Sequence, residues 1–402
     1  MITKNNLSKQ WVKLKPKDYR NKMGQFFTGS VIKDYIEELL TPLNLNPKNA
    51  LEPSVGSCEL VELIQKLYPS VLTDGFELDK ELYDMIVPKT FNVKNEDFLL
   101  SSHETNTKYD LIISNPPYNE LNKLPKDVSK EYKKLFKTEG RSNIYFLFIE
   151  KCLELLEDNG VAVFIIPTSF MSSPSCENVR NLLATTMQIL DIRGFGKFDK
   201  EVAQDVMTLS IRKQPTENIH ENIHENIHEI NFREYTIKIK DQYYLSYCRT
   251  PQTFTKTIGD LPVEIRTGSV VWNQHKELLS NEKTESTVPL VYADNIVNSK
   301  IKPRLHPEKK QYIKIDADKF HISGPKLLMK RSPTNGKFQI APSTTTLCVE
   351  NHVYVIKGTK DELTDFIKYI HHPKAIEFIQ SLSGTAHMSI AMINNIPIFD
   401  LS

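Results

Sequence analysis

Residues 109–118 read Tyr-Asp-Leu-Ile-Ile-Ser-Asn-Pro-Pro-Tyr, and this stretch constrains the fold more than any other part of the chain. Its run Leu111–Ile113 is short, continuous and apolar, which is typical of a strand buried on both faces of a parallel sheet. Pro116 and Pro117 end the strand because a proline cannot donate a backbone hydrogen bond. We therefore expect Asn115–Tyr118 just past the carboxyl end of a central strand, where open α/β sheets bind ligands.

The tetrapeptide Asn115-Pro116-Pro117-Tyr118 carries groups suited to a planar amino group. The Asn115 side-chain oxygen and the Pro116 carbonyl are neighbouring acceptors, and together they can bind both protons of an exocyclic amine such as that of adenine. Binding both protons draws the nitrogen lone pair out of conjugation and makes the nitrogen a better nucleophile. The Tyr118 ring offers a flat face on which a base can stack. The structural alternative is a Pro-Pro turn that caps a strand, with Tyr118 as an amphipathic surface aromatic.

The bulk properties suit a globular protein with a large core. The chain has 402 residues, of which 40% are hydrophobic and 25% charged, so two domains, or one large domain with an addition, are expected. No apolar run approaches the roughly 18 residues that span a bilayer, and the amino terminus lacks the apolar segment of a signal peptide. The five cysteines are scattered without metal-ligand spacing. We expect a cytoplasmic protein with no membrane segment and no structural metal.

The net charge of +1 hides two strongly basic segments. Residues 1–27 hold seven basic side chains against one acidic side chain, and residues 300–340 hold eleven against three. The rest of the chain is therefore acidic. This separation indicates a polyanionic partner that meets two basic regions. The alternative is a solvated charged face at each segment.

Two motifs with small or aromatic residues precede the central stretch. Met23–Thr28 places two adjacent phenylalanines in a turn that contains a glycine, where they could line a ligand pocket; Thr28 or Ser30 could also cap the following helix. Glu52-Pro53-Ser54-Val55-Gly56-Ser57 lies between a predicted strand and a predicted helix. Its small residues let a ligand approach the backbone closely. The dinucleotide fingerprint of three spaced glycines is absent.

Acidic residues follow the next two predicted strands. Glu77 ends the strand predicted over 71–76, at a position where an acidic residue typically binds ribose hydroxyls. Asp79 is better placed to cap the next helix. Asp97 follows a short strand near 91–93 and could accept a hydrogen bond from the amino group of a bound adenine, with Phe98 covering the ring. The alternative at each position is a helix cap beside a core aromatic.

The alternation of strands and helices predicts a doubly wound sheet that continues to residue 212. We expect a polar loop over 119–141, a helix over 143–157 closed by Asn159-Gly160, and strands over 161–166, 189–195 and 206–212. A first domain over 1–214 is then followed by a low-complexity linker over 215–230. The linker repeats Glu-Asn-Ile-His three times, and a slipped repeat explains His220, His224 and His228 better than a metal site does.

Residues 231–402 lose this alternation and predict a mixed α+β recognition domain. Short β-like runs, such as 234–239, 262–266, 326–330 and 352–356, are separated by Pro, Gly and Asn turns. The segment Gly324–Ser332 places Lys326, Lys330 and Arg331 around an apolar strand. We expect these cations to reach phosphates or a guanine edge.

The order of these motifs resembles that of the gamma group of N6-adenine DNA methyltransferases, which occur in restriction–modification systems. Gln25–Thr28 corresponds to the family's amino-terminal Phe-Thr motif, and Glu52–Ser57 corresponds to its cofactor loop. Glu77 corresponds to the ribose acid, Asp97-Phe98 to the adenine-binding pair, and Asn115–Tyr118 to the Asn-Pro-Pro-Tyr motif. The resemblance covers most of residues 20–212 and extends more loosely to the recognition domain.

The resemblance implies a Rossmann-like class I methyltransferase sheet, followed by a target-recognition domain, and S-adenosylmethionine as the cofactor. It implies a catalytic motif at Asn115, Pro116, Pro117 and Tyr118. It implies stacking of the target base between Tyr118 and Phe198, which is expected in the loop between the last two strands. The cofactor-binding residues that it implies are Phe27, Thr28, Glu52, Pro53, Ser54, Gly56, Glu77, Asp97, Phe98 and Asn115.

The implied reaction is direct methyl transfer to the N6 nitrogen of an adenine in double-stranded DNA. The base must first leave the helix, which costs a few kcal/mol. No metal is needed. We expect a monomer that acts on double-stranded DNA and has no membrane partner. We expect any cognate restriction endonuclease to act as a separate protein.

Three other functions fit the same residues. An RNA adenine methyltransferase would present the same amino group. A methyltransferase that modifies a glutamine side chain in a release factor would fit the same two acceptors, although that family carries its extra domain before the catalytic one. A DNA-binding specificity subunit with a decayed catalytic half is the alternative that is not an enzyme, and the intact motif at Asn115–Tyr118 argues against it.

Overall fold

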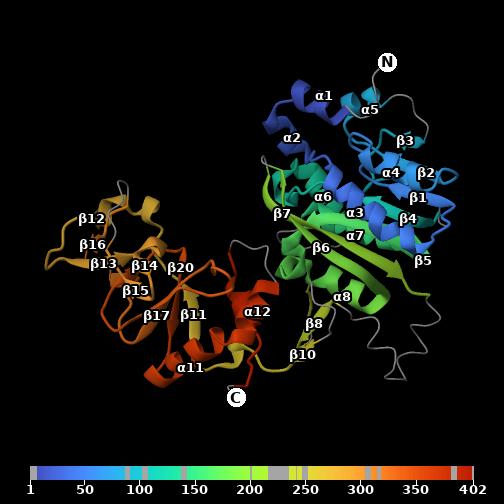
Figure 1. Cartoon of the computed structure of the whole chain (residues 1–402). Coiled ribbons are helices and arrows are strands. Elements are labelled where there is room, and N and C mark those ends of the chain that lie inside the picture. The colour runs from blue at the N-terminus through green and yellow to red at the C-terminus, as the bar shows by residue number, and fades with distance from the viewer. Residues whose placement is uncertain are drawn as a thin grey trace. The chain divides into compact units, whose positions relative to one another are not determined.

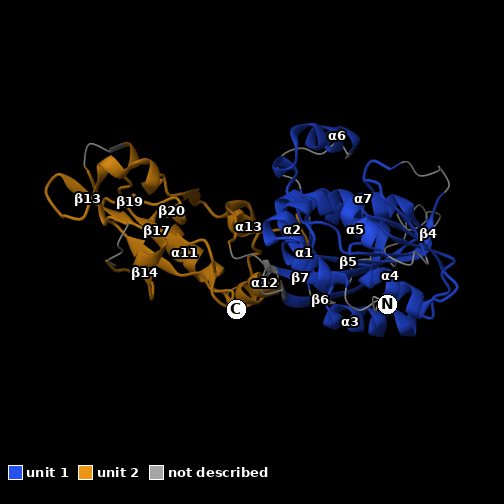
Figure 2. Cartoon of the chain, turned by 90° about the horizontal axis from the view of Figure 1, so that it is seen from above, with its two compact units in different colours: residues 1–237, 242–252 blue, residues 238–241, 253–402 orange. Residues whose placement is uncertain are grey.

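The computed structural model describes residues 7–86, 91–101, 107–136, 143–199, 202–215, 235–240, 242–246, 252–303, 309–314, 318–381 and 387–400. The chain divides into two compact units (Figure 2). The first comprises residues 1–237 and 242–252, and the second comprises 238–241 and 253–402. Residues 216–230 of the expected linker, with the three histidines of its repeat, lie outside the described residues.

A seven-stranded sheet forms the centre of the first unit, in the order β3-β2-β1-β4-β5-β7-β6 (Figure 1). Neighbouring strands from β3 to β5 are parallel, whereas β7 runs antiparallel to both β5 and β6. The predicted doubly wound sheet is therefore confirmed. The strands are β1 (Asn49–Glu52), β2 (Leu72–Phe76), β3 (Asn92–Lys94), β4 (Tyr109–Ser114), β5 (Leu156–Pro167), β6 (Met187–Asp199) and β7 (Val202–Lys213).

Helices cover both faces of this sheet. Leu111 and Ile113 of β4 pack with α3 (Ser30–Leu40) and α4 (Glu59–Leu67) in one buried cluster. Ile112 packs into the cluster on the opposite face, with α7 (Ile144–Leu155) and α8 (Glu177–Thr186). All three β4 side chains are fully buried, as the continuous apolar run predicted. The remaining helices of the unit are α1 (Leu7–Leu14), α2 (Lys17–Met23), α5 (Lys80–Met85) and α6 (Lys126–Phe136).

Two local predictions for the first unit were wrong. The expected polar loop over 119–141 contains a short 3-10 helix, Leu121–Lys123, followed by α6, because Val128 and Tyr132 give this lysine-rich segment an apolar stripe at helical spacing. Asn159-Gly160 do not cap a helix. The helix α7 ends at Leu155, and these two residues lie within β5, where its register with β4 shifts.

Residues of the hairpin formed by β8 (Thr236–Ile239) and β9 (Gln242–Leu245) pack into the core of the first unit. Tyr235 and Leu245 join the buried cluster that includes α7 and α8. The buried Arg180 of α8 donates from its Nε atom to the carbonyl oxygen of Tyr243 at 2.7 Å. The chain therefore divides later than the boundary expected at residue 231.

The second unit mixes small sheets with helices. Its larger sheet has the order β11-β20-β17-β18 and is antiparallel throughout. Its strands are β11 (Glu264–Thr267), β20 (Val353–Lys357), β17 (Lys326–Lys330) and β18 (Ile340–Ser343). A second sheet joins β12 (Leu279–Ser280), β16 (Tyr312–Lys314), β13 (Thr287–Val291) and β19 (Cys348–Val349), and β14 (Ile296–Val297) pairs with β15 (Lys300–Ile301). The helices are α11 (Lys360–Ile370), α12 (Pro373–Ser381) and α13 (Ile390–Asn394). The strand β10 (Gln252–Phe254) pairs with β8 in a three-stranded sheet of order β10-β8-β9.

Among the described residues, no helix is long and apolar enough to cross a membrane.

Candidate active site

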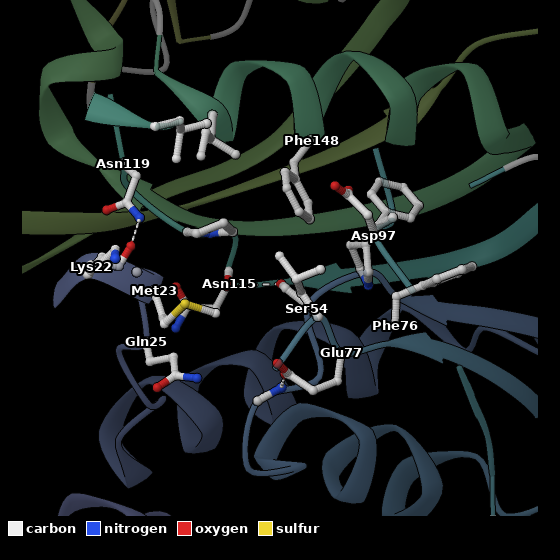
Figure 3. Close-up of a pocket in the computed structure, with 18 of the residues that line it drawn as sticks. Lys22, Met23, Gln25, Ser54, Phe76, Glu77, Asp97, Asn115, Asn119 and Phe148 are labelled. Atoms are coloured by element: carbon white, nitrogen blue, oxygen red, sulfur yellow. Dashed lines mark hydrogen bonds between the residues drawn. The ribbon is translucent and has the colours of Figure 1, made fainter. Parts of the chain in front are cut away.

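A cavity of about 380 Å³ opens at the carboxyl ends of β1 to β4 (Figure 3). This volume falls within the range of roughly 300–1,000 Å³ that is usual for sites that bind small molecules. Residues that the sequence assigned to the cofactor or to catalysis line it: Phe27, Pro53, Ser54, Gly56, Glu77, Asp97, Phe98, Asn115 and Pro117. Thr28 and Glu52 line a small neighbouring cavity that shares Phe27, Ser54, Gly56 and Asn115 with the first.

The Asn115 amide is fixed in one orientation. Its Nδ2 atom donates to the carbonyl oxygen of Phe26 at 2.8 Å and to Oγ1 of Thr28 at 3.2 Å. Its backbone oxygen accepts from Oγ of Ser54 at 3.0 Å, and Figure 3 shows these two residues side by side. With both donors of the amide directed at the segment before α3, the side-chain oxygen is the acceptor left for a ligand or neighbour.

Thr28 therefore helps to hold the Asn115 amide and does not cap a helix. The N-cap residue of α3 is Gly29, which has no side chain to cap the helix, and the buried Thr28 hydroxyl accepts from Asn115 instead. Phe26, which the sequence analysis did not assign, supplies the other acceptor for this amide. The available signal was the pair of adjacent phenylalanines beside a glycine.

Tyr118, the last residue of the motif, contacts the side-chain oxygen of Asn115. Its hydroxyl lies 2.7 Å from Oδ1 of Asn115 and 2.9 Å from the carbonyl oxygen of Ile165, and burial raises the pKa of this tyrosine. Its ring stacks on Phe26, with 6.0 Å between the ring centroids, and meets Tyr145 edge to face. In this arrangement one face of the Tyr118 ring already has an aromatic partner.

Glu77 links the loops after β1 and β2. Its Oε2 atom accepts from the amide of Gly56 at 2.9 Å, and its Oε1 atom accepts from the amide of Asp79 at 2.8 Å. Burial raises the pKa of Glu77 to about 7, against the lowering effect of these backbone hydrogen bonds. Asp79 caps α5, as predicted, by accepting from the amides of Glu81 and Leu82.

One oxygen of the buried Glu52 carboxyl group has no hydrogen-bond partner among the described residues. Its Oε1 atom accepts from the amide and the hydroxyl of Ser54, whereas no described group bonds its Oε2 atom. Burial raises the pKa of Glu52 to about 8. A buried carboxyl oxygen without a hydrogen-bond partner is costly unless a cation or donor reaches it. The acids Glu52, Glu77 and Asp97 therefore fit a ligand with a cationic amine, ribose hydroxyls and an adenine.

Asp97 and Phe98, which follow β3, line the same cavity. Oδ1 of Asp97 accepts from the amide of Leu99 at 2.9 Å, and Oδ2 accepts from the hydroxyl of Tyr132 at 2.6 Å. The buried Phe98 ring lies 5.4 Å from the ring of Phe76 and 5.2 Å from that of Phe148. Tyr132 was missed at the sequence level because the whole segment 119–141 was assigned to a loop.

The structure describes Pro116 and, for Phe198, the backbone alone. Pro116 is buried at the end of β4, as expected. Residue 198 lies within β6 rather than in a loop, because β6 and β7 continue as a long hairpin in which Asp199 pairs with Val202. The side chain of Phe198 lies outside the described residues.

The three cations expected to bind DNA differ in exposure. Lys326 is a correction, because its side chain is buried and its Nζ atom donates to the carbonyl oxygens of Gly324 at 2.6 Å and Thr345 at 2.8 Å. Burial lowers the pKa of this lysine. Lys330 is half-buried, and the Arg331 guanidinium lies over the Tyr354 ring at 5.1 Å. Lys326 therefore stabilises the fold, and a DNA contact stays a prediction for Lys330 and Arg331 alone.

Comparisons with known proteins agree with this geometry. Residues 63–200 match the family described as Eco57I restriction-modification methylase. Over 399 residues the chain is 28% identical to the modification methylase CviBIII of Paramecium bursaria Chlorella virus NC1A, covering 95% of each chain. Over 393 residues it is 26% identical to the Type II methyltransferase M.CvrRI of Paramecium bursaria Chlorella virus XZ-6E, covering 95% of this chain and 96% of the relative.

A solved structure resembles the fold of this chain beyond residues 63–200. The structure of the Type IIL restriction-modification enzyme MmeI in complex with DNA matches 98% of this chain and 71% of its own, with a TM-score of 0.62 and 12% sequence identity. The predicted class I methyltransferase fold with an additional domain is confirmed. The predicted resemblance to restriction–modification methyltransferases is confirmed as well, and S-adenosylmethionine is the cofactor of this class of methylase domain.

Proposed function

We propose that this protein transfers a methyl group from S-adenosylmethionine to the N6 amino group of an adenine that has left a specific double-stranded DNA sequence. The observation that carries the proposal is the fixed Asn115 amide, which follows β4 beside Pro116 and lines a cavity that also contains acidic side chains. The relatives that match over nearly the whole chain are named as a modification methylase and a Type II methyltransferase.

The acids of the cavity and of the small cavity beside it are suited to hold the cofactor. Glu77 is placed to accept from the ribose hydroxyls, Asp97 from the adenine amine, and Glu52 from the cationic amine of the methionine part. Phe98 offers its ring to the adenine. When bound, S-adenosylmethionine supplies an electrophilic methyl group on a sulfonium sulfur.

The chain activates the target nitrogen by hydrogen bonding rather than by a strong base. Oδ1 of Asn115 and the carbonyl oxygen of Pro116 bind the two N6 protons and raise the nucleophilicity of the nitrogen. The sulfonium of bound S-adenosylmethionine would supply the methyl group and keep the electron pair of its S–C bond, and the methylated nitrogen would then lose one N6 proton to water. Positioning and fixed dipoles supply the acceleration, so the chain needs no covalent intermediate. Aromatic stacking of about 1–3 kcal/mol per ring offsets much of the cost of unstacking the base.

We also propose that any cognate restriction endonuclease is a separate protein and that the methyltransferase acts as a monomer. The first part is supported by the two viral relatives, which match over 95% or more of their own length and carry methylase names. Size-exclusion chromatography with light scattering tests the second part, because a dimer would elute with twice the chain mass.

One substrate panel tests the proposed function. The full chain is incubated with methyl-labelled S-adenosylmethionine and, separately, with plasmid DNA, total RNA and a release-factor peptide. We expect label in DNA, recovered as N6-methyladenine after nuclease digestion and mass spectrometry, at one repeated sequence. Label in RNA or in glutamine would replace the proposal with one of the alternative enzymes. Specific DNA binding without transfer would favour the decayed specificity subunit.

A further inference from the structure

The helix α6 forms one wall of the cofactor cavity. Four residues of α6 and of the turn before it line the cavity together with Asp97: Leu124, Pro125, Val128 and Tyr132. Tyr132 is buried in the main core cluster, against which Leu124 and Val128 pack. The helix itself lies at the margin of the first unit (Figure 2). Its position depends on few polar contacts.

One hydrogen bond joins this wall to the residue expected to recognise the cofactor's adenine. The Tyr132 hydroxyl donates to Oδ2 of Asp97 at 2.6 Å. Within the described residues, it is the one side-chain hydrogen bond that links α6 to the rest of the unit. A short bond from a neutral hydroxyl to a carboxylate belongs to the stronger class of hydrogen bonds in proteins.

The Asp97 carboxylate is held at both oxygens. Oδ1 accepts from the amide of Leu99, and Oδ2 accepts from Tyr132. The loop behind it is fixed as well, because Nζ of Lys151 donates to the carbonyl oxygen of Ser101 at 2.8 Å and lies 4.8 Å from the centre of the Phe98 ring. A carboxylate oxygen accepts more than one hydrogen bond, so Oδ2 keeps a lone pair for a ligand while it is bonded to Tyr132.

We propose that Tyr132 is a positioning residue that orients the Asp97 carboxylate toward the amino group of the cofactor's adenine and so sets the preference for an aminopurine cofactor. The inference rests on the proposed function, because it takes Asp97 as the acceptor of that amine. Burial and the hydrogen bond to Asp97 raise the pKa of Tyr132, so its hydroxyl stays protonated and donates at any working pH. Without this donor only the amide of Leu99 holds the carboxylate, at Oδ1, so rotation about the Cβ–Cγ bond is less restricted and the alignment of Oδ2 with the ligand is weakened.

A purely structural role for Tyr132 predicts a different result. A hydrogen bond that only anchors α6 would change stability, and it would change the affinity for all cofactor analogues by the same factor. A residue that aligns Asp97 changes the ratio of two affinities instead. S-adenosylhomocysteine and S-inosylhomocysteine are suitable probes, because they differ by an amino group against a carbonyl at the purine position that Asp97 is expected to face.

The experiment measures both dissociation constants by titration calorimetry on the full chain. Tyr132→Phe removes the hydroxyl and keeps the ring. Tyr109→Phe is a matched control, because the buried Tyr109 also donates to a carboxylate, that of Asp74 at 2.9 Å, and neither residue lines the cavity. We expect the wild-type protein to prefer the adenosyl compound about 10–100-fold, as is usual for a hydrogen bond to a charged group. Tyr132→Phe should reduce this preference about 5–10-fold, and Tyr109→Phe should leave it within about twofold.

Asp97→Asn separates failure of the inference from failure of the proposed function. If Asp97→Asn keeps the wild-type preference, Asp97 does not read the adenine, and both that assignment and the inference are wrong. If Asp97→Asn loses the preference while Tyr132→Phe keeps it, the inference alone is overturned and Tyr132 is an anchor. In support of the inference, Tyr132→Phe should raise KM for S-adenosylmethionine and leave kcat at saturating cofactor nearly unchanged.

The double variant Asp97→Asn/Tyr132→Phe covers the case in which Tyr132→Phe does not fold. It leaves no buried carboxylate without its donor, so it avoids that cost. We expect the double variant to show the same ratio as Asp97→Asn, because the carboxylate that Tyr132 orients is already gone. A further loss of preference in the double variant would contradict the inference.

Discussion

The Tyr118 hydroxyl lies 2.7 Å from the side-chain oxygen of Asn115, and that oxygen is the acceptor that the proposed reaction requires. The same hydroxyl also lies 2.9 Å from the carbonyl oxygen of Ile165. It has one proton to share between two acceptors. A target amino group that binds Asn115 therefore competes with Tyr118 for the same oxygen, and Ile165 offers the hydroxyl an alternative partner.

Variants of Tyr118 should separate its hydroxyl from its ring. Tyr118→Phe removes the competing donor and keeps the stacking face, so we expect KM for DNA to fall about two- to tenfold, in line with one neutral hydrogen bond. Tyr118→Ala removes the ring as well and should lower kcat/KM about 10–100-fold. Steady-state methylation kinetics on an oligonucleotide check both values. Equal losses in the two variants would show that the hydroxyl, rather than the ring, serves the reaction.

Gly24 should prove irreplaceable in the segment before α3. Its φ of +67° is left-handed, and a Cβ added there would lie 2.6 Å from Cβ of Pro117 in the Asn115–Tyr118 motif. Gly24→Ala should cost about 1–2 kcal/mol of unfolding free energy from the backbone alone and should lower activity by displacing this segment from Asn115. Gly29→Ala is the control, because Gly29 has a φ of −68° and no neighbour within 4 Å of an added Cβ. Urea unfolding and methylation assays compare the two, and equal effects would contradict the close approach to Pro117.

Binding of the cofactor should release protons near neutral pH. Burial raises the pKa of Glu52 to about 8 and that of Glu77 to about 7, so both groups hold protons in the free protein that exposed carboxyl groups have lost. A cationic amine at Glu52 favours its ionised form and expels close to one proton at pH 7. Calorimetry of S-adenosylhomocysteine binding in phosphate and in Tris measures the release. Glu52→Gln should reduce it, and Glu38→Gln, on the exposed face of α3, should not; enthalpies that do not depend on the buffer would contradict the prediction.

The same two acids should make the free protein less stable as the pH rises. Their folded pKa values lie above the ordinary value of 4.5, so between that value and about 8 for Glu52, or about 7 for Glu77, the folded state binds more protons than the unfolded state. Unfolding then releases protons, and raising the pH favours it. We expect Tm of the free protein to fall between pH 6 and 8, and less steeply in Glu52→Gln. A Tm that rises over this range would contradict the burial of a protonated Glu52.

Variants of the two lysines of β17 should separate an effect on DNA binding from an effect on stability. Lys330→Ala should lower the slope of log K against log salt by about 0.9 for one lost phosphate contact. Lys326→Met should leave the slope unchanged and change Tm, because the buried Lys326 bonds two carbonyl groups of its own unit. Fluorescence anisotropy from 50 to about 200 mM salt checks both variants. An unchanged slope in Lys330→Ala would place the DNA surface elsewhere.

The sequence predicted the parts of the site that depend on strand ends. The apolar run of β4 and the two prolines after it located Asn115. The acids after β2 and β3 were located in the same way, because the carboxyl ends of parallel strands lie at the same edge of a sheet. It did not predict what holds these groups. The bond from Asn115 to Phe26 joins residues 89 positions apart, and no local pattern marks such a pair.

Other failures have physical causes of their own. The lysine-rich composition of α6 hid Val128 and Tyr132, which lie at helical spacing, and the Tyr132 hydroxyl bonds Asp97. Lys326 was assigned to DNA because of its charge, although strand alternation places it on the same face of β17 as Leu328, which is fully buried. Phe198 was assigned to a loop because the length of a hairpin is poorly marked when polar residues continue into both strands.

Asn115→Ala tests the central claim most directly. The variant removes the acceptor that binds the target amine and leaves the acids of the cofactor cavity in place. Formation of N6-methyladenine is measured by mass spectrometry in a fixed time course, and binding of S-adenosylhomocysteine is measured by calorimetry. We predict a loss of methylation of about 10²–10³-fold or more, as is usual for removal of a group that stabilises developing charge, with the dissociation constant within about twofold of the wild-type value. Methylation of adenine at the wild-type rate in this variant would contradict the account.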